Sequence, residues 1–177
     1  MRLQIYLIKE IVKTKQRQLR DAVMVPVLII GLISASFIPV VQPQAALAVD
    51  NYNVTALTNK ERIKHGLSPL MYDETLEQAA LAKAQDMISR NYFAHYYGDT
   101  TPWDFIITAG EDDWIYAGEN LAKNYTDSAA LVEAWMDSQL HRENILNANY
   151  DHIGVAVMKV NLKGSTIVLT VQMFTGA

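Results

Sequence analysis

The sequence predicts an α+β fold, because helical patterns come first along the chain and strand patterns come last. Up to about residue 136, apolar residues recur at intervals of three and four, which is typical of helices with one buried face. The segments Ile153–Val160 and Thr166–Phe174 are rich in β-branched residues and flank a short polar turn, which predicts a β-hairpin. Half of the 177 residues are hydrophobic, enough for the core of one domain, or two at most.

The first helix is expected over about Val54 to His65, with Gly66 ending it. Asp73 has the character of an N-cap for a second helix that runs to about Asn91, with acidic residues in its first turn. The buried stripe of this second helix is expected to contain Leu76, Ala80, Ala84, Met87 and Ile88, whereas Lys83, Gln85 and Asp86 fall outside it.

Two further helices are expected before the hairpin. The first follows Thr101, because Pro102 suits the first position of a helix. After Gly118 the chain is expected to pass through a loop or a short strand. Thr126 or Asp127 then caps the last helix.

The N-terminal region has a different composition from the rest of the chain. A basic region, residues 1–21, precedes an apolar segment, residues 22–41, which as a helix would reach roughly 30 Å, the thickness of the hydrocarbon core of a membrane. The segment is either a transmembrane anchor, which its length favours, or the h-region of a signal peptide cleaved near Ala48. In both cases the positive-inside rule places the remainder of the chain outside the cell. Residues 42–52 are expected to link the segment to a domain of residues 53–177.

Charge and cysteine content narrow the possible partners of this domain. Residues 1–49 carry a net charge of +4, whereas residues 50–177 carry nine basic and seventeen acidic side chains, a net charge of −8. An acidic domain of this kind argues against nucleic acid as a partner. Because the sequence contains no cysteine, the exported domain has no disulfides, and its stability depends on its core or on a bound ion.

Three segments place a histidine or a glutamate beside aromatic residues or glycine: Tyr92–His95, Ala117–Ala122 and Val132–Trp135. A fourth, Ser138–Asn147, carries His141 directly after a helical pattern and before a turn bracketed by asparagines. Together they resemble the bacterial, cysteine-free branch of the CAP superfamily, which groups cysteine-rich secretory proteins, antigen 5 and pathogenesis-related proteins. The resemblance spans about Thr55 to Phe174. It implies an extracellular (SCP-like) domain with a three-layer α-β-α sandwich.

The resemblance also implies a site. His95 and His141 match the family histidines that hold a divalent ion in a central cleft, and Glu119 and Glu133 match glutamates that line the same cleft. Imidazole and carboxylate groups are suitable ligands for Zn²⁺ or another divalent cation. The two glutamates would orient the histidines, complete the ligand shell through water, or act as a catalytic general base. Alternatively, the four side chains form a hydrogen-bonded network that only fixes the loops.

Two neighbours of His141 are expected to have structural roles. Asn144 would close the turn after His141 through bonds from its side chain to the backbone. Arg142 would bind a carboxylate.

These observations lead to three hypotheses about function. In the first, the domain acts at the cell envelope as a binding or interaction module for an envelope component, a lipid or a peptide. In the second, it is an envelope hydrolase of peptide or glycan with Glu119 or Glu133 as general base, although the sequence contains no His-Glu-x-x-His motif, no Gly-x-Ser-x-Gly motif and no cysteine nucleophile. In the third, it is a purely structural envelope protein without a ligand.

Overall fold

The structure is a computed structural model that describes residues 48–162 and 165–177. The expected basic region, residues 1–21, and the expected anchor or signal segment, residues 22–41, lie outside these residues. Among the helices that are described, none combines the length and the hydrophobicity that crossing a membrane requires.

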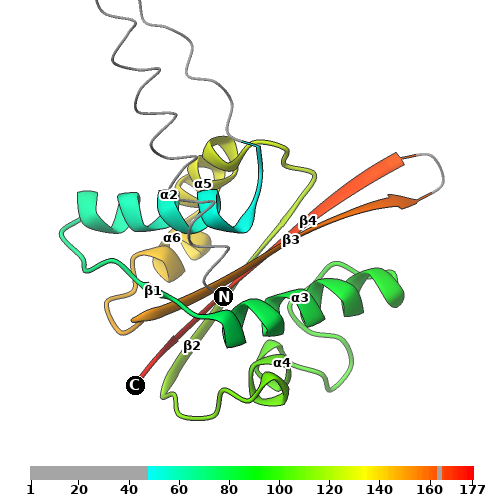
Figure 1. Cartoon of the computed structure of the whole chain (residues 1–177), viewed down its shortest axis with the longest axis horizontal. Coiled ribbons are helices and arrows are strands. Elements are labelled where there is room, and N and C mark those ends of the chain that lie inside the picture. Colours follow the sequence, from blue (N-terminus) through cyan, green and yellow to red (C-terminus); the bar gives the residue numbers. More distant parts are fainter. Residues whose placement is uncertain (1–47, 163–164) are drawn as a thin grey trace, which may run out of the picture. The chain divides into compact units, whose positions relative to one another are not determined.

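The described chain forms a four-stranded sheet with helices on both of its faces (Figure 1). The strand order is β1-β3-β4-β2; β1 runs parallel to β3, and the other neighbours are antiparallel. In chain order the elements are α2 (Asn51–Lys64), β1 (Met71–Tyr72), α3 (Glu74–Ser89), α4 (Pro102–Ala109), β2 (Tyr116–Lys123), α5 (Ser128–Asp137), α6 (Gln139–Ile145), β3 (His152–Leu162) and β4 (Ser165–Gly176). Helix α2 begins at Asn51, inside the expected linker of residues 42–52.

Short polar residues begin four of the helices, as the sequence predicts for three of them. Asp50, Asp73, Thr101 and Asp127 each accept a hydrogen bond from a backbone N–H in the first turn of the helix that they cap. Thr101 also forms a capping box with Asp104, which accepts from the backbone of Thr101 in return. These caps satisfy donors that a helix cannot satisfy internally, and so they define where each helix starts.

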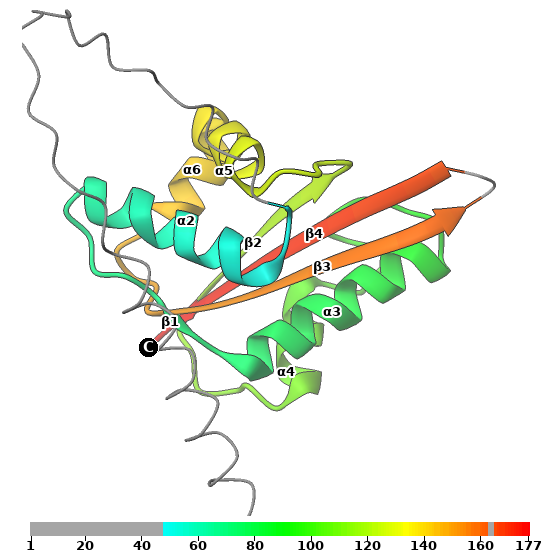
Figure 2. The same cartoon turned by 45° about the horizontal axis from the view of Figure 1, so that its top comes forward.

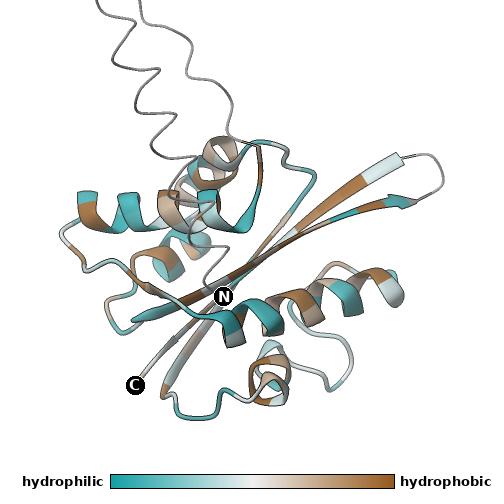
Figure 3. Cartoon of the chain, viewed as in Figure 1, coloured by the Kyte–Doolittle hydropathy of each residue, from teal (hydrophilic) through white to brown (hydrophobic). Residues whose placement is uncertain are grey.

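Two apolar clusters, one on each face of the sheet, form the core. Figures 1 and 2 show α2, α5 and α6 on one face and α3 with α4 on the other. Alternate residues of β3 contribute to the two clusters: Ile153 and Val155 pack with the α2 side, and Ala156 packs with the α3 side. Figure 3 shows hydrophobic residues along β3 and β4, between the helices. This arrangement confirms the α+β class and the three-layer α-β-α sandwich.

Gly154 allows α3 to approach β3 closely. A Cβ atom at this position would lie 2.2 Å from the carbonyl carbon of Leu76 and 2.3 Å from the backbone nitrogen of Glu77. Only glycine fits there, because the atoms that a side chain would meet belong to the backbone of the first turn of α3. The contact therefore fixes α3 against the sheet at this point.

A buried arginine connects the first helix to the segment that carries His141. Arg62 of α2 is 2% exposed, and its guanidinium donates hydrogen bonds to the backbone carbonyls of Ser68, Ile145, Asn147 and Tyr150. Burial lowers the pKa of Arg62. Four carbonyl partners satisfy the charged group inside the protein and hold the end of α6 in place.

Candidate functional site

The centre of the candidate site is a hydrogen bond between a histidine and a buried carboxylate. Glu119 lies in β2, opposite Met173 of β4, and its side chain is 1% exposed. The Nδ1 atom of His95 lies 2.6 Å from its Oε1 atom, while the side chain of His95 remains 47% exposed. Because a carboxylate oxygen accepts, Nδ1 of His95 is the donor of this bond, and in the neutral form of the imidazole the lone pair is then on Nε2.

The other carboxylate oxygen of Glu119 has an unusual environment. Glu119 Oε2 is buried, and among the described residues it has no hydrogen-bond partner. Buried oxygens in folded proteins almost always have a partner, so an isolated one points to a functional role or to a bound ligand or water.

His141 joins the same site from the other side through two asparagines. The side chain of Asn120, next to Glu119 in β2, donates to the carbonyl oxygen of His141 at 3.2 Å. Asn144 donates to the carbonyl oxygen of Glu119 at 3.0 Å and to Oδ1 of Asn120 at 2.9 Å. These bonds tie the backbone of α6 to the backbone of β2, so the two site histidines belong to one connected network.

The imidazole of His141 is held by its own helix. Its Nδ1 atom lies 2.8 Å from Oγ of Ser138, at the N-terminus of α6. Burial lowers the pKa of His141, and the charge of His95 lowers it further. Both effects favour the neutral imidazole, which is the form that binds a metal ion.

Lys83 also belongs to the site, although helical periodicity predicts it to be exposed. It was expected outside the buried stripe of α3, but its side chain is completely buried. Its ammonium group donates to the carbonyl oxygen of His95 at 2.6 Å and to the hydroxyl of Tyr92 at 3.2 Å. Burial lowers the pKa of Lys83, while the carboxylates of Glu119 and Asp86 act in the opposite direction. Lys83 therefore both holds the His95 loop and places a positive charge near buried Glu119.

Glu133, the fourth residue expected in the cleft, lies elsewhere. It is exposed on α5 and lines a different groove, of about 400 Å³, together with Lys60, Glu61 and Lys64 of α2. The reason is the helix period: two residues correspond to a rotation of about 200°, so Glu133 points away when Trp135 packs on the sheet. The structure thus brings His95 and Glu119 together directly and His141 through Asn120 and Asn144, but it does not bring Glu133 to them.

The residues of this site would hold a divalent ion with two histidines only, so that most positions around the ion stay open. Over residues 48–162 and 165–177, no group of three or more histidine, aspartate or glutamate side chains is arranged to hold a metal ion. Two imidazoles remain, each with Nδ1 engaged by a neighbouring side chain, which is how ligand histidines are usually oriented in metal sites. An ion at this place would be held by His95 and His141, with its other positions open to water or to a ligand.

Three side chains around His141 make contacts that the sequence did not predict. Ser138 precedes His141 by three residues, a spacing that brings two side chains onto one face of a helix, and this signal was available. Asn144 bonds to the backbone, as predicted, but to a different strand and not to its own turn. Arg142 donates to the carbonyl oxygen of Met136 at 2.6 Å and not to a carboxylate.

The fold and the histidine–carboxylate pair define the class of this protein. The chain belongs to the CAP family, the cysteine-rich secretory protein family, which matches it over residues 55–174. The family resemblance seen in the four motifs is thereby confirmed.

Two curated proteins of Bacillus subtilis (strain 168) are similar to the chain. It is 48% identical over 109 residues to the uncharacterized protein YkwD, covering 60% of this chain and 41% of that protein. It is 41% identical over 101 residues to the uncharacterized membrane protein YlbC, covering 57% of this chain and 29% of that protein. The chain therefore spans less than half the length of these relatives.

Solved bacterial structures share the fold. An extracellular protein containing an SCP domain from Bacillus anthracis str. Ames is 28% identical with a TM-score of 0.61, covering 72% of this chain and 40% of that one. An outer surface protein of Borrelia burgdorferi is 24% identical with a TM-score of 0.62, covering 74% of this chain and 98% of that one, a likeness of fold alone.

Proposed function

We propose that this CAP domain is displayed on the outer face of the cell membrane and acts there as a binding module whose two histidines, His95 and His141, hold a divalent cation such as Zn²⁺. The apolar segment of residues 22–41 would anchor the domain. The similarity of the chain to a protein named as a membrane protein supports this location. The domain itself carries a net charge of −8 over residues 50–177, which favours cations over nucleic acids and other polyanions.

The hydrogen bond from His95 to buried Glu119 carries this proposal. It fixes the tautomer of the imidazole so that Nε2 is free to bind an ion, and it increases the basicity of that atom. The lowered pKa of His141 keeps the second ligand neutral near pH 7. A bound ion would supply positive charge at the site and leave positions open for a carboxylate or another anionic group of a partner.

Calorimetric titration of Zn²⁺ into the full chain tests the proposal. We expect one equivalent to bind, with the affinity reduced at least tenfold by His95→Ala or by His141→Ala. Substitution of His65, an exposed histidine at the end of α2, is the matched control and should leave the affinity unchanged. The hypothesis of a purely structural protein predicts the opposite pattern: lower melting temperatures for the site variants and no binding of Zn²⁺ to any of them.

A hydrolase is a separate hypothesis, which the variant Glu119→Gln addresses. Glu119 is the remaining candidate for a general base, because Glu133 is exposed in another groove. If the protein is a binding module, the wild type should show no turnover of peptide or glycan substrates, and Glu119→Gln should only weaken the binding of Zn²⁺. Turnover by the wild type that Glu119→Gln abolishes would instead support a hydrolase.

A further inference from the structure

The edge of β3 that faces β1 is open along most of its length. β1 pairs only with His152 and Ile153, whereas β3 continues to Leu162. The carbonyl oxygen of Ile153 accepts from the backbone N–H of Asp73, so the backbone groups of Ile153 face this edge. Because these directions alternate along a strand, the N–H and C=O groups of residues 157 and 159 face the same edge. No described residue forms a backbone hydrogen bond with them there.

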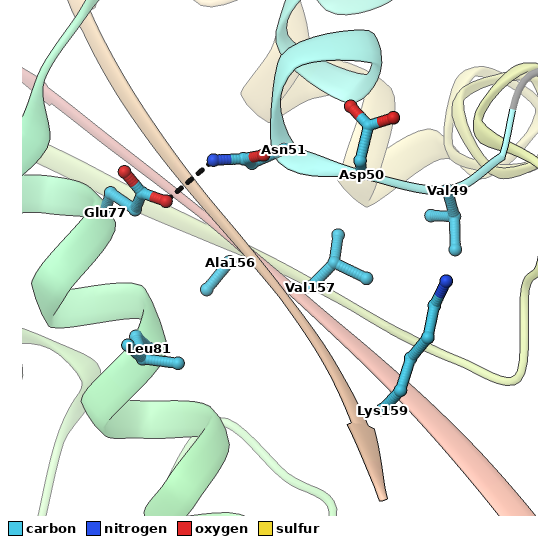
Figure 4. Close-up of a pocket in the computed structure, with 8 residues that line it drawn as sticks. All are labelled: Val49, Asp50, Asn51, Glu77, Leu81, Ala156, Val157 and Lys159. Carbon is cyan, nitrogen blue, oxygen red and sulfur yellow. Dashed lines mark hydrogen bonds between the residues drawn. The ribbon is translucent and has the colours of Figure 1, made fainter.

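A groove of about 390 Å³ lies beside this open edge and is drawn in Figure 4. We call it the β3 groove. The residues before and at the start of α2 form one wall, α3 forms the other, and β3 lies between them: Val49, Asp50, Asn51, Glu77, Leu81, Ala156, Val157 and Lys159. Its volume lies within the range of known ligand sites, and its lining contains both apolar and charged residues.

The two ends of the β3 groove carry opposite charges. At one end the carboxylate of Glu77 accepts a hydrogen bond of 2.7 Å from the side chain of Asn51. Asp50 lies further along the same wall, between Asn51 and Val49 (Figure 4). At the other end the ammonium group of Lys159 extends from β3 toward Val49 (Figure 4). A ligand that lies along the groove would therefore meet negative charge at one end and positive charge at the other.

We propose that the β3 groove binds an extended segment of another polypeptide as an additional strand. The backbone of that segment would pair with residues 157 and 159, a basic group would lie near Glu77, and an acidic group would lie near Lys159. This proposal concerns a surface apart from the histidine site and does not depend on the proposed binding of a cation.

The recessed position of the edge favours a single strand over a second copy of this chain. Paired strands lie about 4.8 Å apart. In a second copy the same edge would lie between its own α2 and α3 (Figure 2). The helices of the two copies would therefore meet before their strands could pair, whereas one extended chain brings no such flanking elements.

Amide hydrogen exchange of the full, isotopically labelled chain tests the proposal. The probes are the blocked hexapeptide Ac-Arg-Thr-Val-Thr-Val-Asp-NH₂ and the peptide of reversed sequence, which cover both strand directions. We expect the amides of Val157 and Lys159 to exchange fast in the free chain and at least tenfold more slowly with one of the two peptides at millimolar concentration. The same peptide with alternate N-methylated amides, which cannot pair with a strand, should give no slowing.

Charge variants identify the ends of the groove. Lys159→Glu should weaken the binding of the better peptide at least fivefold, and replacing the aspartate of the peptide by lysine should restore it. Lys60→Glu makes the same charge change in the other groove and should have no effect.

Three results would overturn the proposal. The first is the absence of slowing with both peptides. The second is slow exchange in the free chain that becomes slower still as the protein concentration rises, which would show a second copy at the edge. The third is slow exchange in the free chain that does not depend on concentration, which would show that a segment of the same chain covers the edge.

Discussion

Replacing Lys83 by methionine should destabilise the protein by about 3–5 kcal/mol, the usual cost of removing one partner from a buried charged network. The ammonium group of Lys83 is fully buried and donates two hydrogen bonds, to the carbonyl oxygen of His95 and to the hydroxyl of Tyr92. Methionine keeps the apolar stem but leaves both acceptors without this donor, and it removes the positive charge near Glu119. For a domain of this size the loss corresponds to a decrease in Tm of roughly 10–20 °C.

Urea denaturation of the full chain, followed by the fluorescence of its three tryptophans, measures this loss. Lys60→Met is the matched control, since Lys60 is exposed, and it should change the free energy of unfolding by less than about 0.5 kcal/mol. A double-mutant cycle with Glu119→Gln isolates the interaction of the two charges, and we expect a coupling of at least about 1 kcal/mol. A loss below about 1 kcal/mol for Lys83→Met, or additive effects in the cycle, would refute the role assigned to this lysine.

Two further substitutions test the packing of α3 and the protonation of the site. Gly154→Ala should lower the free energy of unfolding, measured by urea titration, by about 3 kcal/mol, because the new Cβ would lie 2.2 Å from the backbone of Leu76. The control Gly98→Asn changes a left-handed position with free space around it and should lower the free energy of unfolding little. Equal losses for the two variants would contradict the packing argument. Because the pKa of His141 is lowered in the folded protein, the unfolded chain binds more protons than the folded protein once the pH falls toward and below 6.5. The free energy of unfolding should therefore decrease as the pH falls from 7.5 to 5. His141→Gln should reduce this dependence when urea midpoints are measured with a chelator present, and an unchanged pH profile would show that His141 does not cause it.

The fold could be predicted from the sequence because its signals are local. N-caps such as Asp73 and Thr101, and the change from helical to β-branched patterns at Ile153, depend on nearest neighbours along the chain. The two-residue strand β1 was missed because it is formed only by pairing with β3, which lies far away in the sequence. For the same reason the open edge of β3 was not foreseen.

The candidate site was predictable only in part. The motifs around His95, Glu119 and His141 identified residues that the structure connects, since family motifs record spatial neighbours. Glu133 shared a motif but not the site, because the rotation of α5 turns it toward solvent. Lys83 is polar and was therefore expected to be exposed, but the partners that allow its burial come from other segments. Hydrophobic periodicity alone contains no information about such partners.

The central claim, that His95, Glu119 and His141 form one connected site, is tested most directly by nuclear magnetic resonance of the imidazole nitrogens of the full chain during addition of Zn²⁺. We predict that the Nε2 resonances of His95 and His141 shift together and saturate at one equivalent, while Nδ1 of His95 keeps the proton that it donates to Glu119. Separate saturation of the two histidines, or loss of the Nδ1 proton of His95, would contradict the claim.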